Sequence, residues 1–130
     1  MAGFISSLGS VYKLLRSALA RKGVDVGGTA GYPRVEIHTI IESAPMDKAG
    51  DMKYVSAIVE CISEKKMQDV IEMNNENLHR MLGESLGIAD GWRVCGVAQG
   101  QVQQLTESTE TNAILYRLLQ NVTIYVERIK

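Results

Sequence analysis

The residues that could carry out chemistry are few and widely spaced. The chain has two histidines, His38 and His79, and two cysteines, Cys61 and Cys95. A thiol and an imidazole that folding brings together could act as a nucleophile and its base. Neither histidine has an evident carboxylate partner with a nucleophile nearby in the sequence. Both cysteines lie in apolar, strand-like runs, which favours buried reduced thiols over a disulfide. The sequence therefore predicts surface or boundary histidines, core thiols and no enzymatic activity.

Patterns for a metal, a cofactor or a phosphate are weak. The cysteines and histidines lack the paired spacing of a zinc site, so we expect no metal and no cofactor. The segment Asp25-Val26-Gly27-Gly28-Thr29 is similar to the first phosphate loop of sugar kinases and actin-like ATPases, where glycines let backbone N–H groups approach phosphate. Such a loop should follow a buried strand, whereas Ala20-Arg21-Lys22-Gly23 indicates the end of a helix. A flexible linker is the favoured interpretation.

The composition indicates one ordinary globular domain over residues 1–130. Apolar residues make up 45% of the chain and the net charge is −1, so no general attraction to nucleic acid is expected. Residues 1–34 carry five basic side chains against one acid, and residues 35–90 carry eleven acids against five bases. This polarity suits oriented docking, and a solvated helix face explains it equally well. Without a signal peptide or an apolar run of about 20 residues, we expect cytoplasmic synthesis and no membrane span.

Hydrophobic periodicity predicts two helices and four strands. Apolar residues recur at helical spacing over residues 4–22 and 66–86, and they alternate in the strand-like segments. The predicted fold class is α+β, with a four-stranded, mostly antiparallel sheet packed with two helices in the order α-β-β-α-β-β. The expected segments are an N-terminal helix (1–22, its periodic part 4–22), a Gly-rich connector (23–33) and an α+β core (34–130) with strands at 34–43 and 52–63, a helix at 66–86, a strand from 92 and a last strand at 113–129.

Several local signals refine these boundaries. Ser63 is a suitable N-cap for the second helix, and Ala89-Asp90-Gly91-Trp92 is typical of a turn into the next strand. Gly96 and Gly100 predict a bulge or bend within that strand. The last strand has one apolar face if its register slips near Leu118–Leu119.

Some surface residues of the predicted helices, strands and loops are candidates for docking. The Gln-rich half of the third long strand could be an edge used for subunit pairing or a polar outer face, and both interpretations stay open. The basic first helix could lie on a membrane or on nucleic acid, but packing within the protein is favoured. The candidate docking residues are Arg16, Arg21, Met46, Asp47, Lys48, Gln99, Gln101, Gln103, Glu107 and Glu110.

The order of elements points to a family. An N-terminal helix and a Gly-rich joint with Tyr32-Pro33 precede two strands around a long loop. A helix that begins Gln68-Asp69-Val70-Ile71 and reaches Leu82 comes next, and Asp90-Gly91-Trp92 leads into the closing strands. This layout resembles the tail-completion or tail-terminator proteins of long-tailed bacteriophages and related contractile particles. The resemblance spans nearly the whole chain and concerns element order, length and pattern rather than a short motif.

The resemblance implies a structural virion protein. Such proteins form a ring, commonly of six copies, that caps the tail tube and provides the surface to which the head docks. The implied partners are further copies of the chain, the tail tube protein and a neck or head-completion protein. DNA would pass through the lumen without specific binding, and the ring would lie in the tail or neck of a virion assembled in the host cytoplasm. Loops 44–52 and 106–112 would reach the tube or the neck.

Two alternatives remain open at this stage. The first is another ring protein of the neck, such as a head-completion protein. The second is a small ligand-binding or enzymatic domain of ferredoxin-like type, with a cleft lined by His38, Cys61 or Cys95.

Overall fold

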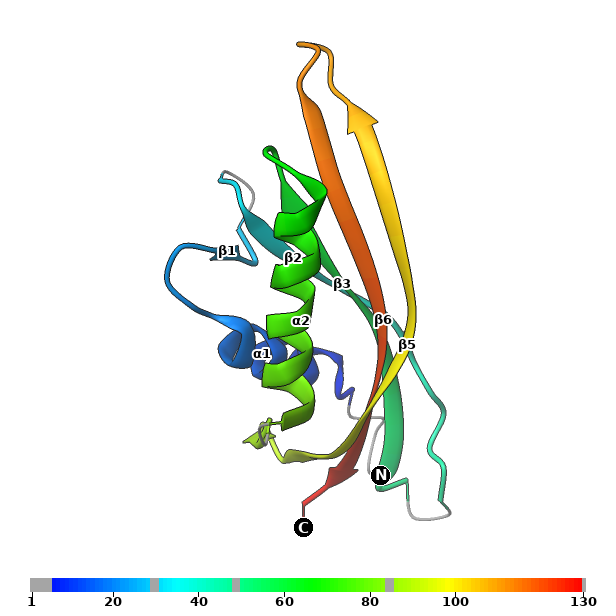
Figure 1. Ribbon diagram of the computed structural model, residues 1–130. Coiled ribbons are helices and arrows are strands. Elements are labelled where there is room, and N and C mark those ends of the chain that lie inside the picture. The colour runs from blue at the N-terminus through cyan, green and yellow to red at the C-terminus, as the bar shows by residue number, and fades with distance from the viewer. Residues whose placement is uncertain (1–5, 29–30, 48–49, 84–85, 130) are drawn as a thin grey trace.

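A long, curved sheet carries both helices on one side (Figure 1). The computed structural model describes residues 6–28, 31–47, 50–83 and 86–129. The hairpin formed by the last two long strands continues beyond the end of the longer helix. In chain order the elements are α1 (Leu8–Leu19), β1 (Asp25–Val26), β2 (Arg34–Glu42), β3 (Met52–Ser63), α2 (Met67–Gly83), β4 (Ile88–Ala89), β5 (Trp92–Ser108) and β6 (Ile114–Arg128).

The predicted four-stranded sheet is wrong, because the described sheet has six strands in the order β1-β2-β3-β6-β5-β4. The four long strands do exist near the predicted positions and pair antiparallel. The two extra strands are only two residues long, too short to produce a periodic signal. β1 lies within the expected connector and pairs parallel with β2, so the sheet is mixed. That connector therefore contains an ordered edge strand rather than only a flexible linker.

The core lies between the helices and one face of the sheet. Alternation along β3 directs Val55, Ala57, Val59 and Cys61 toward the helices, and all four are buried. From α1, the buried side chains include Leu15. α1 is shorter than predicted: it ends at Leu19, and residues 4 and 5 lie outside the described part of the chain.

Two arginines tie α1 to α2. Arg21 was predicted to lie in the last turn of the first helix, but α1 ends two residues before it. The guanidinium of Arg21 donates to the Leu19 carbonyl at 2.9 Å and to Asn77 Oδ1 of α2 at 2.8 Å. Burial, together with the nearby charge of Arg80, lowers the pKa of Arg21. Arg80 in turn donates to the Ala18 carbonyl at 3.4 Å. These bonds satisfy carbonyl groups that the end of α1 would otherwise leave without partners.

The start of α1 is held by a carboxylate from the sheet. Glu42, at the end of β2, accepts hydrogen bonds from the backbone N–H and the hydroxyl of Ser7. Its other oxygen lies 3.6 Å from Nζ of Lys53, whose side chain is buried and lies over the ring of Trp92. Burial acts to raise the pKa of Glu42, but the hydrogen bonds from Ser7 and the charge of Lys53 outweigh it, so the pKa lies below its ordinary value.

β5 contains the irregularities that its glycines predicted. Its register against β6 shifts between Val94 and Gly96 and again between Gln99 and Val102, so the predicted bulges are confirmed. The predicted slip near Leu118–Leu119 is wrong, because β6 keeps one register against β3 throughout.

Gln120 explains that error and fills the second bulge. It is fully buried on the helix side of β6, at a position where the pattern calls for an apolar residue. Its Nε2 donates to the carbonyls of Gly100 and Asn121 at 3.0 and 2.9 Å, and its Oε1 accepts from Asn74 of α2 at 3.2 Å. The amide therefore joins β6, α2 and the bulged strand.

The turns and the ends of α2 agree only in part with those predicted from the sequence. Asp90 and Gly91, both with positive φ, form the predicted two-residue turn between β4 and β5. Ser63 is not the N-cap, because α2 begins at Met67; its hydroxyl accepts from the Lys65 N–H and donates to Asp69. α2 ends at Gly83, earlier than predicted.

We expect Gln120→Leu to lower the free energy of unfolding by roughly 2 kcal/mol, because it leaves the buried Asn74 amide without its partner and removes the donor to the Gly100 carbonyl. Urea denaturation followed by circular dichroism measures the change. The matched control is Gln103→Leu on the exposed part of β5, for which a change within about 0.5 kcal/mol is expected. Equal effects of the two substitutions would contradict a structural role for the Gln120 amide.

Glu42 should make stability depend on pH. Because its folded pKa is lowered, its contribution is complete above its ordinary value of 4.5 and is lost as the pH falls through the folded pKa. Glu42→Gln should therefore lower stability by about 1 kcal/mol near pH 7, comparable to loss of a helix cap, and by less at pH 3. Urea denaturation of both proteins from pH 3 to 7 tests this, and a gap independent of pH would refute it.

Candidate functional site

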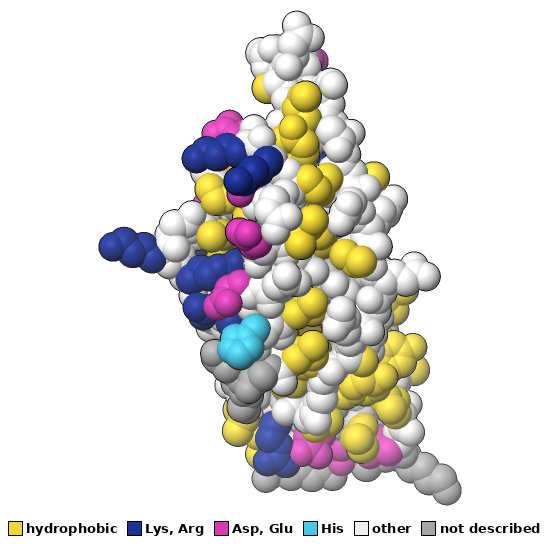
Figure 2. All heavy atoms as spheres, in the orientation of Figure 1, with side chains coloured by type: hydrophobic (Ala, Val, Ile, Leu, Met, Phe, Trp, Pro, Cys, Tyr) yellow, Lys and Arg dark blue, Asp and Glu magenta, His cyan; other side chains and the backbone are white. Residues whose placement is uncertain are grey.

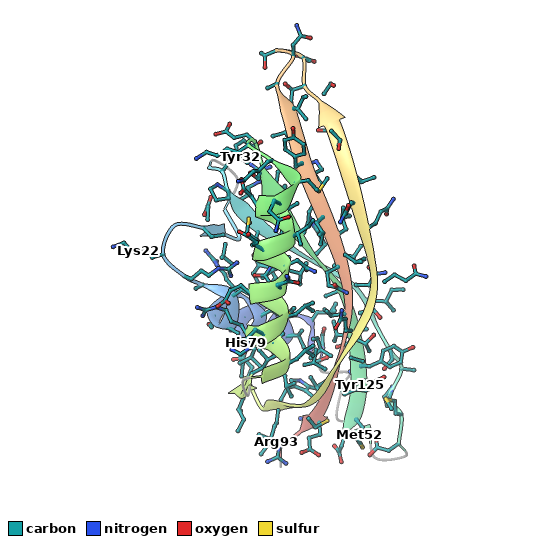
Figure 3. All side chains as sticks on the ribbon, viewed as in Figure 1. Lys22, Tyr32, Met52, His79, Arg93 and Tyr125 are labelled. Carbon is teal, nitrogen blue, oxygen red and sulfur yellow. The ribbon has the colours of Figure 1, made fainter. Side chains whose placement is uncertain are left out.

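The helices cover only one face of the sheet. The opposite surface, which we call the open face, consists of the side chains of β2, β3, β6 and β5 that point away from α1 and α2. In Figure 3, the labelled Met52 and Tyr125 lie on this side of the lower sheet, whereas His79 lies on α2 and Lys22 projects from the α1–β1 connection. The open face carries charged, apolar and polar regions in turn.

A row of ion pairs, centred on Glu60, crosses the middle of the open face. The Glu60 side chain is only 9% exposed, and its Oε1 lies 3.2 Å from Nε2 of His38. Its Oε2 accepts from Arg117 at 2.8 Å, and Arg117 also lies 3.4 Å from Glu107. The hydrogen bond and the charge of Glu60 raise the pKa of Arg117. The row thus links β2, β3, β6 and β5.

The row continues along β2. Nε of Arg34 lies 2.8 Å from Oε2 of Glu36, and the guanidinium also lies 4.7 Å from the centre of the Tyr32 ring. The other oxygen of Glu36 lies 3.9 Å from Nε2 of His38. His38 therefore stands between two carboxylates, each of which also binds an arginine.

An apolar patch occupies the lower end of the open face and the adjoining β2–β3 loop. Tyr54 and Tyr125 lie opposite each other on β3 and β6, with ring centres 6.3 Å apart in an edge-to-face arrangement. Figure 2 shows hydrophobic side chains exposed along the long strands and gathered near the lower end. Exposed apolar residues grouped in this way are typical of interaction surfaces. The patch contains Ile41, Met46, Met52, Tyr54 and Tyr125.

The strand edge beyond the bulge is the least covered part of the fold. Every residue of the segment Ala98–Ser108 is exposed, on the helix side as well as on the open face. β4 pairs only with Trp92 and Arg93, so among the described residues no strand pairs with the outer edge of this segment. We call Ala98–Ser108 the β5 arm. An edge of this length with both faces exposed offers backbone groups for strand addition.

The predicted docking residues fall into three groups rather than one site. Four of them, Gln99, Gln101, Gln103 and Glu107, are exposed on the β5 arm, and Glu110 is exposed in the hairpin loop beyond it. Met46 and Asp47 are exposed at the opposite end of the sheet (Figure 1). Arg16 is exposed on α1, Arg21 binds α2, and Lys48 lies outside the described residues.

The structure does not form the proposed cleft of thiols and imidazole. His38 lies on the open face, whereas Cys61 points to α2, where Asn77 donates to its sulfur at 3.2 Å. Burial raises the pKa of Cys61 to about 12. Cys95 is exposed at the first bulge, so its predicted burial is wrong. Both thiols are free. Cys61 pairs with Leu118 of β6, whereas the neighbours of Cys95 pair with Tyr125 and Val126, at least seven residues further along β6, or about 23 Å at strand spacing. This separation is too large for a disulfide.

Sequence reasoning missed the cluster around His38. The available signal is the spacing Glu36-x-His38, which places both side chains on one face of a strand. Glu60 could not have been predicted to join this cluster, because its approach to His38 depends on the pairing register of β2 with β3.

Neither described helix is long and apolar enough to span a membrane.

Comparison with known proteins gives a structural likeness and no sequence family. No family model and no curated protein sequence matches the chain. A chain in the solved structure described as the virion of a native gene transfer agent (GTA) particle matches with a TM-score of 0.64. The match covers 90% of this chain and 91% of that chain at 17% identity. The likeness therefore concerns the fold, which occurs in a virion particle.

The two thiols should differ sharply in reactivity. We expect one thiol per chain to react quickly with Ellman's reagent at pH 8, because Cys95 is exposed while Cys61 is buried and protonated. Cys95→Ser should abolish the fast reaction, and both thiols should react in urea. Fast reaction of two thiols in the native protein would contradict the burial of Cys61.

Proposed function

We propose that this chain is a structural subunit of a phage-like particle and that it closes the tail tube as a ring. The observation that carries the proposal is the β5 arm, which is exposed on both faces and has a free edge. The virion fold shared over 90% of the chain supports the same class of function. The resemblance in element order to tail-terminator proteins supports the position at the end of the tail.

The two ends of the sheet offer separate contacts for such a ring. The β5–β6 hairpin loop and the β2–β3 loop lie at opposite ends of the molecule (Figure 1). A subunit in a ring has its neighbours beside it and its tube and neck partners above and below. The β5 arm would serve the neighbours, and the two loops would serve the tube protein and the neck protein.

A second copy is the natural occupant of the arm. A ring gives every subunit the same two neighbours, so each free edge is covered without leaving an open end. The arm has one acidic side chain, Glu107, and otherwise neutral side chains. The arm therefore brings little charge of its own to a contact with a different surface of the neighbouring copy. Six copies is the number that the family resemblance implies.

The proposed function requires DNA to pass through the lumen of the ring without binding to it. A net charge of −1 gives the ring little general affinity for a polyanion, and passage without specific binding is favoured. The partners under this proposal are further copies of the chain, the tail tube protein and a neck protein.

Ring formation can be tested with a matched pair of substitutions. The purified protein should form rings of about six copies, measured by light scattering after size exclusion and seen by negative-stain microscopy. Leu105→Asp, at a leucine of the β5 arm that is 40% exposed, should prevent them because it places a charge in the covered arm. Leu82→Asp, at a leucine of α2 that is 45% exposed, is the control and should leave the rings intact.

Two results would overturn the proposal. One is a stable monomer at high protein concentration that also fails to assemble on tail tubes, and the other is ring formation by Leu105→Asp equal to that of the unchanged protein. Disruption of the gene in a producing strain tests the position at the tail. Overlong tubes are expected because nothing stops tube growth, whereas tubes of normal length would indicate another ring of the neck.

A further inference from the structure

Three potential metal ligands converge on the open face. They are a carboxylate oxygen of Glu36, a ring nitrogen of His38 and a carboxylate oxygen of Glu60, and these atoms all lie within 4.8 Å of one another. The imidazole nitrogen is 3.2 Å from the Glu60 oxygen and 3.9 Å from the Glu36 oxygen. Two ligands of a tetrahedral metal with bonds near 2.0–2.2 Å are separated by roughly 3.4 Å. Both distances from the imidazole nitrogen are therefore close to the spacing that one metal ion requires.

The backbone holds this arrangement from both sides. Glu36 and His38 lie two residues apart on β2, so their side chains share a face. Glu60 pairs directly with Glu36 across the β2–β3 ladder. The three ligands thus come from two adjacent strands, β2 and β3, which pair along this stretch.

Two arginines orient the carboxylates without using the converging atoms. Arg34 binds Oε2 of Glu36 and Arg117 binds Oε2 of Glu60, each at 2.8 Å. In both residues Oε1 is the oxygen that faces His38. A hydrogen-bonding partner behind a ligating carboxylate is a usual feature of metal sites, because it fixes the orientation of the ligand. The arginines also offset the repulsion between the two carboxylates when no metal is bound.

The ligand types select the class of metal. One imidazole and two carboxylates suit zinc and similar first-row divalent ions, whereas magnesium and calcium prefer oxygen ligands alone. Glu60 is nearly buried and the His38 side chain is 46% exposed, so the cluster opens to solvent beside the imidazole. A bound ion would keep its remaining position there, available to water or to a group from a partner.

We propose that Glu36, His38 and Glu60 form a binding site for one Zn²⁺ ion or a similar first-row divalent ion on the open face. The site is separate from the β5 arm and does not depend on ring formation.

Zinc titration of the full-length chain tests the proposal. The exposed thiol of Cys95 is another potential zinc ligand, so the measurements use Cys95→Ser as the background. Calorimetry, or competition with a chromophoric zinc indicator, should give one Zn²⁺ per chain near pH 7. His38→Ala should weaken binding roughly 100-fold or more, since loss of even a hydrogen-bonding group behind a ligand costs 10–100-fold. Glu36→Gln should weaken it in the same direction.

The chain supplies its own control. His79→Ala removes the other histidine, which is exposed on α2 outside the cluster, and should leave zinc affinity unchanged. Zinc should also raise the melting temperature of the background protein and of His79→Ala but not of His38→Ala, because only a site in the folded chain stabilises it. Absence of one-to-one binding in the background protein, or equal binding by His38→Ala and His79→Ala, would overturn the site.

Discussion

The shape of the molecule depends on how one buried amide is satisfied. Gln120 lies on the core side of β6, where a polar group without partners would cost about 1–3 kcal/mol. The bulge in β5 turns the Gly100 and Gln101 carbonyls toward it, and α2 provides Asn74. Gly100 suits this position because a Cβ there would lie 3.2 Å from Asn121. The bulge, the position of α2 and the path of β5 are therefore coupled through a single side chain.

The exposure of the β5 arm follows from this coupling. Before the bulge, β5 contributes Trp92, Val94 and Val97 to the packing beneath the helices. After it, the strand still pairs with β6, but both faces of the arm are left exposed. The proposed interaction surface is thus continuous with the core through β6 instead of being a loose appendage. Such an anchor limits the entropy that the arm would lose when a neighbour binds.

The sequence was sufficient to predict the long helices and strands, but not the side-chain contacts and strand pairing that hold them together. Periodicity located β2, β3, β6 and α2 within a few residues, and the glycines of β5 revealed both bulges. The same rules misread Gln120 as a break in register, because a satisfied buried amide and a strand irregularity look alike in a hydrophobic pattern. The cluster of Glu36, His38 and Glu60 depends on strand pairing, and no local signal reports which residues will face each other across a ladder.

The bulges also restrict which strands can pair with the long exposed edge of β5. An uninterrupted edge would accept almost any extended segment, since backbone groups repeat with every residue. The two register shifts divide β5 into three runs, Trp92–Val94, Gly96–Gln99 and Val102–Ser108. A strand that adds along the whole edge must follow the same bend, and one register step would place its side chains on the wrong face. Identical subunits in a ring meet that requirement at every interface, because each presents the same interrupted edge to the same complementary surface of its neighbour. The interruption that Gln120 stabilises would therefore confer selectivity as well as shape.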